Sequence, residues 1–303
     1  MSIRTVTSSE NRQSLLDLQR TDERLANNQQ RISSGNRLVN AGDDPAAAAS
    51  IVDLGNSIQA NTEYLKQITA ATSYLSPAED AVNAAVNANM RLQELATEAG
   101  ASNLTAADRA SELAEIDSIR TNLVSIANTQ SQGKYLFAGM KTTTAPFTDA
   151  VPPALPTYNG DQGSINVTVS PSQTVATNIP GDQVFENGGP GSASNFFQAI
   201  ADLRDGITSN NTAQIQTAST NLTTVLGNLN QVLSVLGGRQ AGLSALTDTL
   251  SGFNVSLQSI QSTQQATDYP TAAVEYASDQ TAQSATLSAM AKISKTNLFD
   301  YLA

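Results

Sequence analysis

Carboxylates are the main side chains that could carry chemistry in this chain. The sequence has no histidine and no cysteine, which removes imidazole bases, thiolate nucleophiles and the usual zinc ligand sets. One pair of carboxylates, Asp43-Asp44, could act in acid–base chemistry or bind a metal ion. However, Asp44 stands directly before Pro45 and an alanine-rich stretch, which is typical of a helix N-cap followed by proline at the first helical position. We therefore interpret the pair as a helix start beside a tight turn.

Four further carboxylates lie in the middle of the chain: Asp149, Asp161, Asp182 and Glu186. Their spacing matches no catalytic template. The glycine-rich run at residues 188–191 follows no strand and precedes no lysine, so it predicts a linker rather than a phosphate-binding loop. We expect no enzyme activity, no cofactor and no metal. A secreted enzyme or sugar-binding module in this region is the rival interpretation, and it would depend on these four carboxylates alone.

Charge and hydropathy limit the partners. The 303 residues carry 27 acidic and 16 basic side chains, a formal net charge of −11. Nucleic-acid-binding proteins need a basic face to neutralise phosphates, so nucleic acid is not an expected partner. No segment is as long and apolar as a membrane-spanning helix, and the first residues lack the apolar core of a secretory signal. We therefore expect no membrane crossing, and any export must use another route.

The most regular pattern is a ladder of leucines near the C-terminus. Six of them follow one another at seven-residue steps: Leu222, Leu229, Leu236, Leu243, Leu250 and Leu257. A second apolar row, interrupted by Arg239, stands three residues further on: Val225, Val232, Leu246, Phe253 and Ile260. This period predicts a long helix packed along a partner helix. We expect the six leucines to form the core of a helical rod.

Both ends of the chain carry thinner stripes. The N-terminal stripe consists of Leu18, Leu25, Ile32 and Val39, and the C-terminal seam consists of Ala277, Ser284, Leu287, Ala291 and Leu298, with Tyr301 near its end. Neither stripe alone offsets a backbone entropy of about 1–2 kcal/mol per residue. We predict that the two ends pair with each other and with neighbouring copies, as an assembly interface that orders on polymerisation. An ordinary ordered core helix is the alternative for the N-terminal stripe.

Helix boundaries can be placed between these patterns. The segment from Asn40 to Pro45 predicts a break, and helical periodicity then continues to about Gly100. Within it, residues 76–79 read either as a capping box that opens a new helix or as a kink in one continuous helix. A further helix is predicted from Thr105, with Asp108 three residues on, to about Gly133.

The middle of the chain differs in composition. Residues 138–191 are rich in Pro, Gly, Thr and Asn, and Ile165, Val167 and Val169 alternate with polar residues behind an Asn159-Gly160 turn signal. We predict a mainly α fold: an elongated antiparallel helical coiled-coil rod, formed by the N- and C-terminal segments, with a small β-rich insertion. The expected domains are a terminal helical assembly layer (1–42 plus 265–303), a helical rod core (43–137 plus 192–264) and a β-rich outer insertion (138–191).

Several motifs resemble the flagellin superfamily along nearly the whole chain. The segment RISSGNRLVNAGDDPAAAAS at residues 31–50 is similar to its N-terminal signature, LGGRQAGL at 236–243 to its returning core helix, and KISKTNLFDYL at 292–302 to its C-terminal signature. In the middle, YLFAGMKTTTAPF at 135–147 and YNGDQGSINVTV…IPGDQVF at 158–185 resemble the hook–filament junction branch. A filament-forming flagellin with a reduced outer domain is the alternative.

The resemblance implies a structural, self-assembling adaptor layer of the bacterial flagellum. Its implied partners are neighbouring copies of itself, the hook-side junction protein, flagellin and an export chaperone on the C-terminal helix. It also implies export by the flagellar type III system to an extracellular location, without a cleaved signal peptide.

A short segment at residues 90–96 is similar to the part of some flagellins that an innate immune receptor engages. Arg91, Glu94 and Leu95 match that motif, whereas Gln93 stands where those flagellins usually have arginine. An ordinary exposed helix face is the alternative interpretation.

Overall fold

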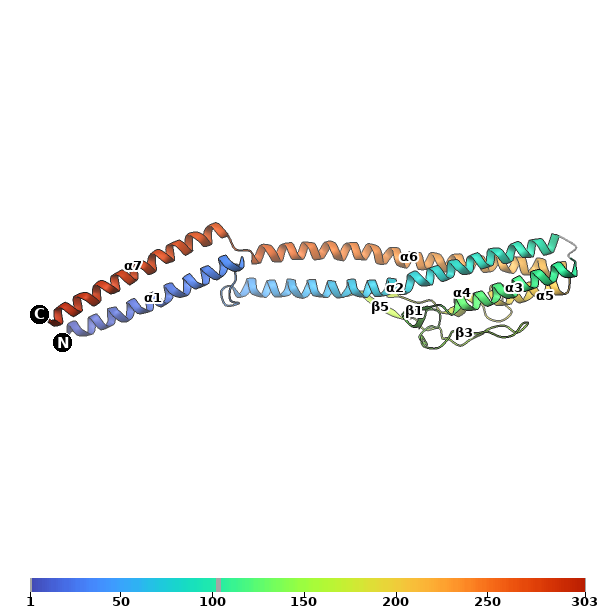
Figure 1. The fold of residues 1–303 in the computed structure, drawn as a ribbon, viewed down its shortest axis with the longest axis horizontal. Helices are drawn as coiled ribbons and strands as arrows, with labels where there is room; N and C mark the ends of the chain where they lie inside the picture. Colours follow the sequence, from blue (N-terminus) through green and yellow to red (C-terminus); the bar gives the residue numbers. More distant parts are fainter. Residues whose placement is uncertain (1, 102–104, 303) are drawn as a thin grey trace. The chain divides into compact units, whose positions relative to one another are not determined.

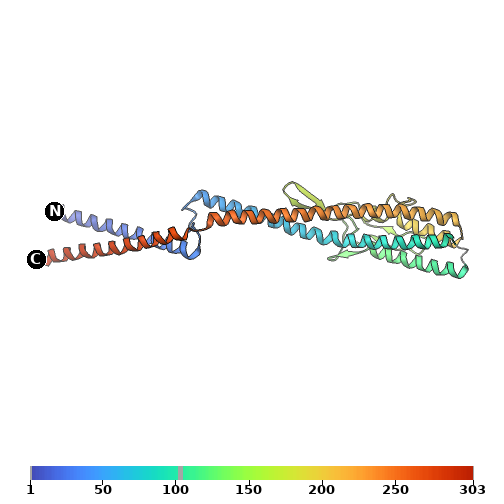
Figure 2. The same ribbon diagram turned by 90° about the horizontal axis from the view of Figure 1, so that it is seen from above.

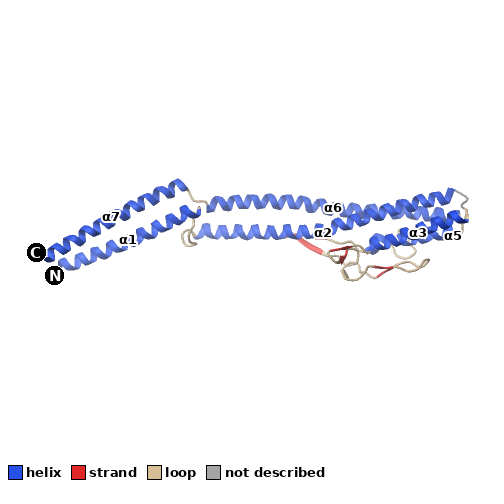
Figure 3. Ribbon diagram, in the orientation of Figure 1, coloured by secondary structure: helices blue, strands red, loops and turns tan. Residues whose placement is uncertain are grey.

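The computed structural model describes the backbone of residues 2–101 and 105–302 and the side chains of residues 12–100 and 105–292. Two compact units make up the fold. The terminal unit comprises residues 1–60 and 253–303, and the central unit comprises residues 61–252. Long helices dominate both units, and the strands are confined to the central one (Figure 3). The predicted mainly α fold with a small strand-containing middle region is confirmed, while the predicted three-part domain division stays a prediction.

Two antiparallel helices lie side by side in the terminal unit (Figures 1 and 2): α1 (Ser2–Ser34) and α7 (Tyr269–Leu302). Helix α1 ends at Ser34 because Gly35 adopts a left-handed φ of +73° and its N–H donates to the Arg31 carbonyl at 3.0 Å. A Cβ on Gly35 would lie 2.8 Å from the Tyr269 hydroxyl. The prediction that Val39 continues the helical stripe is therefore wrong, because Val39 lies in the connection that follows the helix.

The connections that leave α1 and enter α7 bind each other through their backbones. The Arg37 N–H donates to the Gln265 carbonyl at 2.7 Å, and the Thr267 N–H donates to the Gly35 carbonyl at 2.9 Å. Asn36 and Ala266 thus form an isolated antiparallel bridge. This bridge holds the end of α1 beside the start of α7 and so helps to set how the two helices pair.

Helix α2 (Pro45–Ala101) begins as the sequence predicts. The Asp44 carboxylate accepts from the Ala47 N–H at 3.0 Å and lies 3.3 Å from the Arg37 guanidinium. The Ala47 hydrogen bond, assisted by Arg37, lowers the pKa of Asp44 below its ordinary value. The carboxylate pair at residues 43–44 therefore serves local structure, since Asp43 accepts from the Val39 and Asn40 N–H groups.

The leucine ladder lies on helix α6 (Thr212–Gln265). Five of its leucines are buried: Leu222, Leu229, Leu236, Leu243 and Leu250. Leu257 is half-buried. In the second row Phe253 is 58% exposed and Ile260 is 45% exposed, so the prediction that this row continues along a partner is wrong beyond residue 250. Beyond Leu250 the buried position shifts by one residue: Asn254, four residues after Leu250, is 9% exposed, whereas Phe253, three residues after it, faces solvent.

The central unit is a helical bundle with one hydrophobic core. It combines residues 61–101 of α2, α3 (Ala106–Ala127), α5 (Phe196–Thr208) and residues 212–252 of α6. Helix α3 starts at the predicted place, where Thr105 and Asp108 form a capping box, and ends at Ala127, six residues before the predicted end. Among the described residues, no helix is long and apolar enough to span a membrane.

Pro77 lies inside α2, so the continuous-helix interpretation of residues 76–79 is the correct one. Proline cannot donate to the carbonyl four residues earlier, which is that of Ser73. The Ser131 hydroxyl donates to this carbonyl at 3.1 Å, and the Gln132 side chain donates to the Ser73 hydroxyl at 3.0 Å. A hairpin turn thus replaces the hydrogen bond that the proline removes.

The strands form three separate antiparallel hairpins: β1 (Gln130–Ser131) with β2 (Lys134–Tyr135), β3 (Phe147–Thr148) with β4 (Thr157–Tyr158), and β5 (Asn166–Ser170) with β6 (Gln173–Ala176). The predicted strand at residues 165–169 is confirmed within one residue as β5. Asn159-Gly160 follows β4 instead of connecting two paired strands. The first hairpin lies before residue 138, where the predicted insertion begins, and the short helix α4 (Gly181–Phe185) was not predicted.

Aromatic side chains join these hairpins to the bundle. The rings of Phe137 and Phe185 meet edge to face with centroids 5.3 Å apart, and Phe147 packs on Phe185 at 5.7 Å. The Tyr158 hydroxyl lies 3.0 Å from the Phe137 carbonyl and 2.9 Å from that of Asp161. Burial, with the nearby Asp182 carboxylate, raises the pKa of Tyr158 to about 12. Because Phe147 also packs on Phe197 of α5 with centroids 5.4 Å apart, the middle region shares one apolar core with the helical bundle of the central unit.

Candidate assembly interface

The contact between α1 and α7 is a coiled-coil seam in which polar side chains are the most buried on α1. Five residues of α1 share the face that meets α7 at alternating steps of three and four: Leu18, Thr21, Leu25, Asn28 and Ile32. Thr21 is 5% exposed and Asn28 is 7% exposed, whereas the three apolar residues are only half-buried. The predicted residues Leu18, Leu25 and Ile32 therefore lie on this seam, and the sequence pattern missed the polar residues between them.

Helix α7 meets α1 through a different face from the predicted one. Its buried and half-buried residues also follow the three-and-four spacing: Ala272, Tyr276, Asp279, Gln283, Thr286 and Met290. The predicted seam residues are exposed: Ala277, Ser284, Leu287 and Ala291. The expectation that these four pack against α1 is wrong, and their role in contacts between copies stays a prediction. The side chains of Leu298 and Tyr301 lie outside the described residues.

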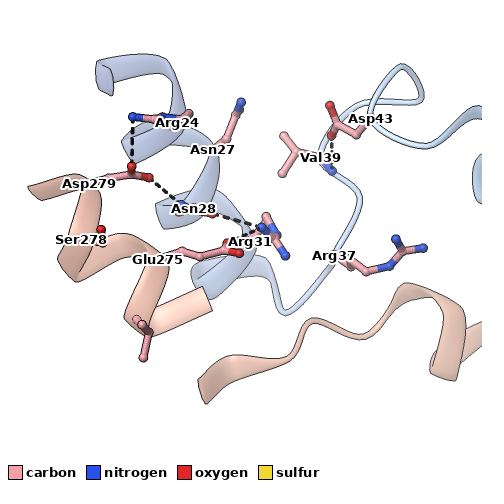
Figure 4. Close-up of a pocket in the computed structure, with 11 residues that line it drawn as sticks. Arg24, Asn27, Asn28, Arg31, Arg37, Val39, Asp43, Glu275, Ser278 and Asp279 are labelled. Atoms are coloured by element: carbon pink, nitrogen blue, oxygen red, sulfur yellow. Dashed lines mark hydrogen bonds and ion pairs between the residues drawn. The ribbon is translucent and has the colours of Figure 1, made fainter. Parts of the chain in front are cut away.

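A polar network crosses the middle of the seam (Figure 4). The Asn28 amide donates to one Asp279 carboxylate oxygen at 2.9 Å, and the Arg24 guanidinium lies 3.4 Å from the other. The Arg31 guanidinium donates to the Asn28 side-chain oxygen at 3.1 Å and to the Glu275 carboxylate at 3.0 Å. Further along, the Gln283 amide donates to Asp22 at 2.7 Å. Each step of this network joins one helix to the other or two neighbouring turns of α1.

An open cleft of about 600 Å³ borders this network. Figure 4 shows its residues, which come from α1, α7 and the connection after α1: Arg24, Asn27, Asn28, Arg31, Arg37, Val39, Asp43, Val274, Glu275, Ser278 and Asp279. Three guanidinium groups and three carboxylates therefore line one polar surface of the terminal unit. Because four of these six charged groups belong to the network or border it, the cleft is a continuation of the seam.

The carboxylates of the middle region hold structure. Asp149 pairs with the buried Arg120 at 2.9 Å, and Asp161 accepts from the Met140 and Gly163 N–H groups at 2.7 and 2.8 Å. Asp182 accepts from the Gln162 amide at 2.8 Å, and burial raises the pKa of Glu186. Across the described part of the chain, no group of three or more acidic, histidine or cysteine side chains could hold a metal ion. This arrangement gives the enzyme interpretation no support.

The segment that matched a receptor-binding motif is tied into the central unit. The Arg91 guanidinium lies 2.6 Å from the Glu115 carboxylate and 2.9 Å from that of Glu94. Leu95 is 1% exposed and belongs to the core. Only part of the motif therefore faces solvent, and its arginine already binds two carboxylates.

Comparison with known proteins identifies the family of the chain. The chain is 32% identical over 237 residues to the flagellar hook-associated protein 3 of Salmonella typhimurium, covering 72% of this chain and 74% of that protein. The chain belongs to the flagellar hook-associated protein 3 family. Residues 4–142 also match the bacterial flagellin N-terminal helical region. The predicted resemblance to the flagellin superfamily and its junction branch is confirmed.

Two solved structures share the fold with this member of the hook-associated protein 3 family. A hook-associated protein from Vibrio parahaemolyticus matches with a TM-score of 0.67 and 21% identity, covering 73% of this chain and 99% of that one. The flagellar junction protein FlgL from Legionella pneumophila matches with a TM-score of 0.59 and 19% identity, covering 73% and 100%. Their low identities mean that they inform us about the fold and not about individual side chains.

Proposed function

We propose that this chain is a structural subunit of the bacterial flagellum that acts as an adaptor at the hook–filament junction. The observation that carries this proposal is its similarity to the hook-associated protein 3 of Salmonella typhimurium over about three quarters of both chains. The Legionella structure with the same fold is a flagellar junction protein. An extracellular location in the flagellum and a role in motility follow from this function.

The proposed partners are neighbouring copies, the hook-side junction protein and flagellin. The terminal unit offers two sets of surfaces for them: the exposed α7 face with Ala277, Ser284, Leu287 and Ala291, and the exposed Leu15 and Leu16 on α1. The apolar side chains of these surfaces, among them Leu15, Leu16 and Leu287, are solvent-exposed in the single chain, so contacts between copies would bury them. The α1–α7 seam, with its half-buried apolar residues, supports only a weak pairing by itself.

We further propose that the two ends complete their folding during assembly. Circular dichroism before and after polymerisation tests this, because ordering of both ends predicts a clear gain of helical signal. Equal helix content in the monomer and the polymer would contradict it. Hydrogen exchange in dilute monomer provides the residue-level control: α6 residues such as Leu229 should be protected while α1 and α7 exchange fast.

A non-catalytic role, type III export and an export chaperone on α7 complete the proposal. Three of the four middle carboxylates are bound to an arginine, an amide or backbone groups: Asp149, Asp182 and Asp161. Deleting residues 140–190 tests the role of this region: a strain that still builds a motile filament would show that junction function does not require it. Truncation before residue 269 should abolish secretion if α7 carries the chaperone site, whereas a chaperone-independent export signal would leave secretion intact.

Electron microscopy of a cell that lacks this chain is the decisive experiment. The junction role predicts hooks without filaments and flagellin shed into the medium, with both defects reversed by the intact gene. A cell that still extends filaments would exclude an essential adaptor. The alternative of a filament-forming flagellin is separated by polymer length, because a junction protein forms a limited layer and a flagellin grows without a fixed end.

A further inference from the structure

The seam between α1 and α7 contains a buried polar pair where an ordinary coiled coil has apolar residues. Asn28 is 7% exposed and Asp279 is 9% exposed, and their side chains meet at 2.9 Å. Burying a carboxylate is unfavourable unless hydrogen bonds or opposite charges replace its water. Both carboxylate oxygens of Asp279 have such a partner, because Asn28 binds one and Arg24 lies beside the other. The pair is therefore satisfied in this arrangement.

The Asp279 carboxylate has these two partners only when α7 is aligned with α1 in the observed register. In an antiparallel pair, a slip of one heptad moves α7 by about 10 Å along α1. Asn28 would then face Thr286 or Ala272, and Asp279 would face Thr21 or the end of α1 near Gly35. Either slip separates the buried carboxylate from Asn28 and Arg24 and places Thr21 or Gly35 opposite it, so its amide partner is lost in both; in the slip toward Gly35, Arg31 would take the place of Arg24. The remaining seam residues are small or half-buried and would discriminate weakly between registers, so the Asn36–Ala266 bridge is the other constraint that acts beside the polar pair.

The same pair also distinguishes between partner helices. Two antiparallel copies of α7 could place Asp279 against Asp279, so like charges would oppose each other. Two copies of α1 would leave Arg24 and Arg31 without Asp279 and Glu275. In the observed α1–α7 pairing each of these arginines has a carboxylate across the seam, Asp279 for Arg24 and Glu275 for Arg31. A single buried polar residue is a known means of fixing register and partner choice in coiled coils.

We propose that Asn28 and Asp279, supported by Arg24, are the specificity determinants of the α1–α7 pairing, and that they select partner, orientation and register. In a polymer, where many copies of both helices are concentrated, they would direct each α1 to an α7 in the correct alignment. That consequence rests on the proposed assembly, whereas the choice of register does not. The experiment below therefore gives its answer whether or not the chain acts at the hook–filament junction.

Cysteine cross-linking in the full-length chain tests the proposal, because the natural sequence contains no cysteine. Asp22→Cys with Gln283→Cys reports the observed register, since these two side chains are in contact. Asp22→Cys with Met290→Cys reports a slip of one heptad. Oxidation is carried out where circular dichroism shows the terminal helices formed, and non-reducing gels separate links within a chain from links between chains.

In the natural background we expect the first pair to form disulfide at least about tenfold faster than the second. Asn28→Leu with Asp279→Leu should keep the helices but reduce this preference to less than about threefold, because leucines pack in either register. Asn28→Asp with Asp279→Asn is the matched control: it reverses the pair, leaves the new carboxylate near Arg24, and should keep the preference. An unchanged preference in the double leucine variant overturns the proposal. Loss of preference in the reversed pair also overturns it, even if the leucine variant does not fold.

Discussion

Replacing Ser131 with alanine tests whether the β1–β2 hairpin stabilises the proline break in α2. The Ser131 hydroxyl donates at 3.1 Å to the Ser73 carbonyl, the group that Pro77 cannot serve. Losing one hydrogen bond of this kind costs about 1 kcal/mol of unfolding free energy. For a unit of this size, that corresponds to a decrease of about 2–4 °C in the melting temperature.

The Pro77→Ala background makes this prediction specific. There the alanine N–H can donate to the Ser73 carbonyl, so Ser131→Ala should cost much less than in the natural chain. The expected coupling between the two substitutions is about 0.5–1 kcal/mol, measured by a double-mutant cycle. Urea unfolding of the full-length chain, followed by circular dichroism, gives the four free energies.

Ser118→Ala is the matched control, because Ser118 is an exposed serine on α3 in the same unit. Its effect should stay within about 0.5 kcal/mol in both backgrounds. If Ser131→Ala costs the same with Pro77 and with its alanine replacement, Ser131 does not compensate for the proline and the reasoning is refuted.

Three further substitutions test other parts of the fold. Leu229→Ala should lower the unfolding free energy by about 2–5 kcal/mol because Leu229 is fully buried. Phe253→Ala, at a residue that is 58% exposed, should cost much less. Similar losses for the two substitutions would contradict the assigned inward face of α6. Under conditions where circular dichroism shows the terminal helices formed, Gly35→Ala should cost about 1–2 kcal/mol because φ is +73° there. Gly42→Ala, with open space around it, is the control. Equal melting temperatures of the two variants would show that the end of α1 tolerates a side chain. Burial, with neighbouring carboxylates, raises the pKa of Glu112, so this group favours folding at pH values below its unfolded pKa and loses that contribution as the pH rises through its folded pKa. Glu112→Gln should therefore raise the melting temperature at pH 7 and have little effect on it below about pH 4. A rise in melting temperature of the same size at both pH values would rule out this explanation.

Hydrophobic periodicity and local capping signals predicted much of the helical framework. The leucines of α6 are visible in the sequence because a buried apolar row repeats with the period of the helix. Asp44 and Thr105 mark helix starts because their side chains bind backbone N–H groups only three residues away. Information of this kind is local, and a single sequence contains it.

The parts that sequence reasoning missed depend on distant partners. The Pro77 alternatives could not be separated because the compensating hydroxyl of Ser131 lies 58 residues away. The end of α1 was placed too late because the strong break signal near residue 40 concealed the left-handed Gly35.

The candidate interface was predicted only in part, for a related reason. Leu18, Leu25 and Ile32 identified the correct face of α1, but a hydropathy pattern treats Asn28 and Asp279 as outward residues. Asn28 lies three residues after Leu25, so its heptad position was a usable signal. Nothing in the sequence of α7 marks its polar face as the buried one, because the pairing with α1 determines which face is covered.

The polar seam has a consequence for how the chain ends behave when they separate. Opening the α1–α7 pair hydrates an amide, two carboxylates and two guanidinium groups, and it uncovers the half-buried Leu18, Leu25 and Ile32. Water solvates the polar groups well, so their separation costs less than the opening of a fully apolar seam would. A polar seam of this kind can therefore separate and pair again at low cost, which would suit the proposed exchange of contacts between copies during assembly.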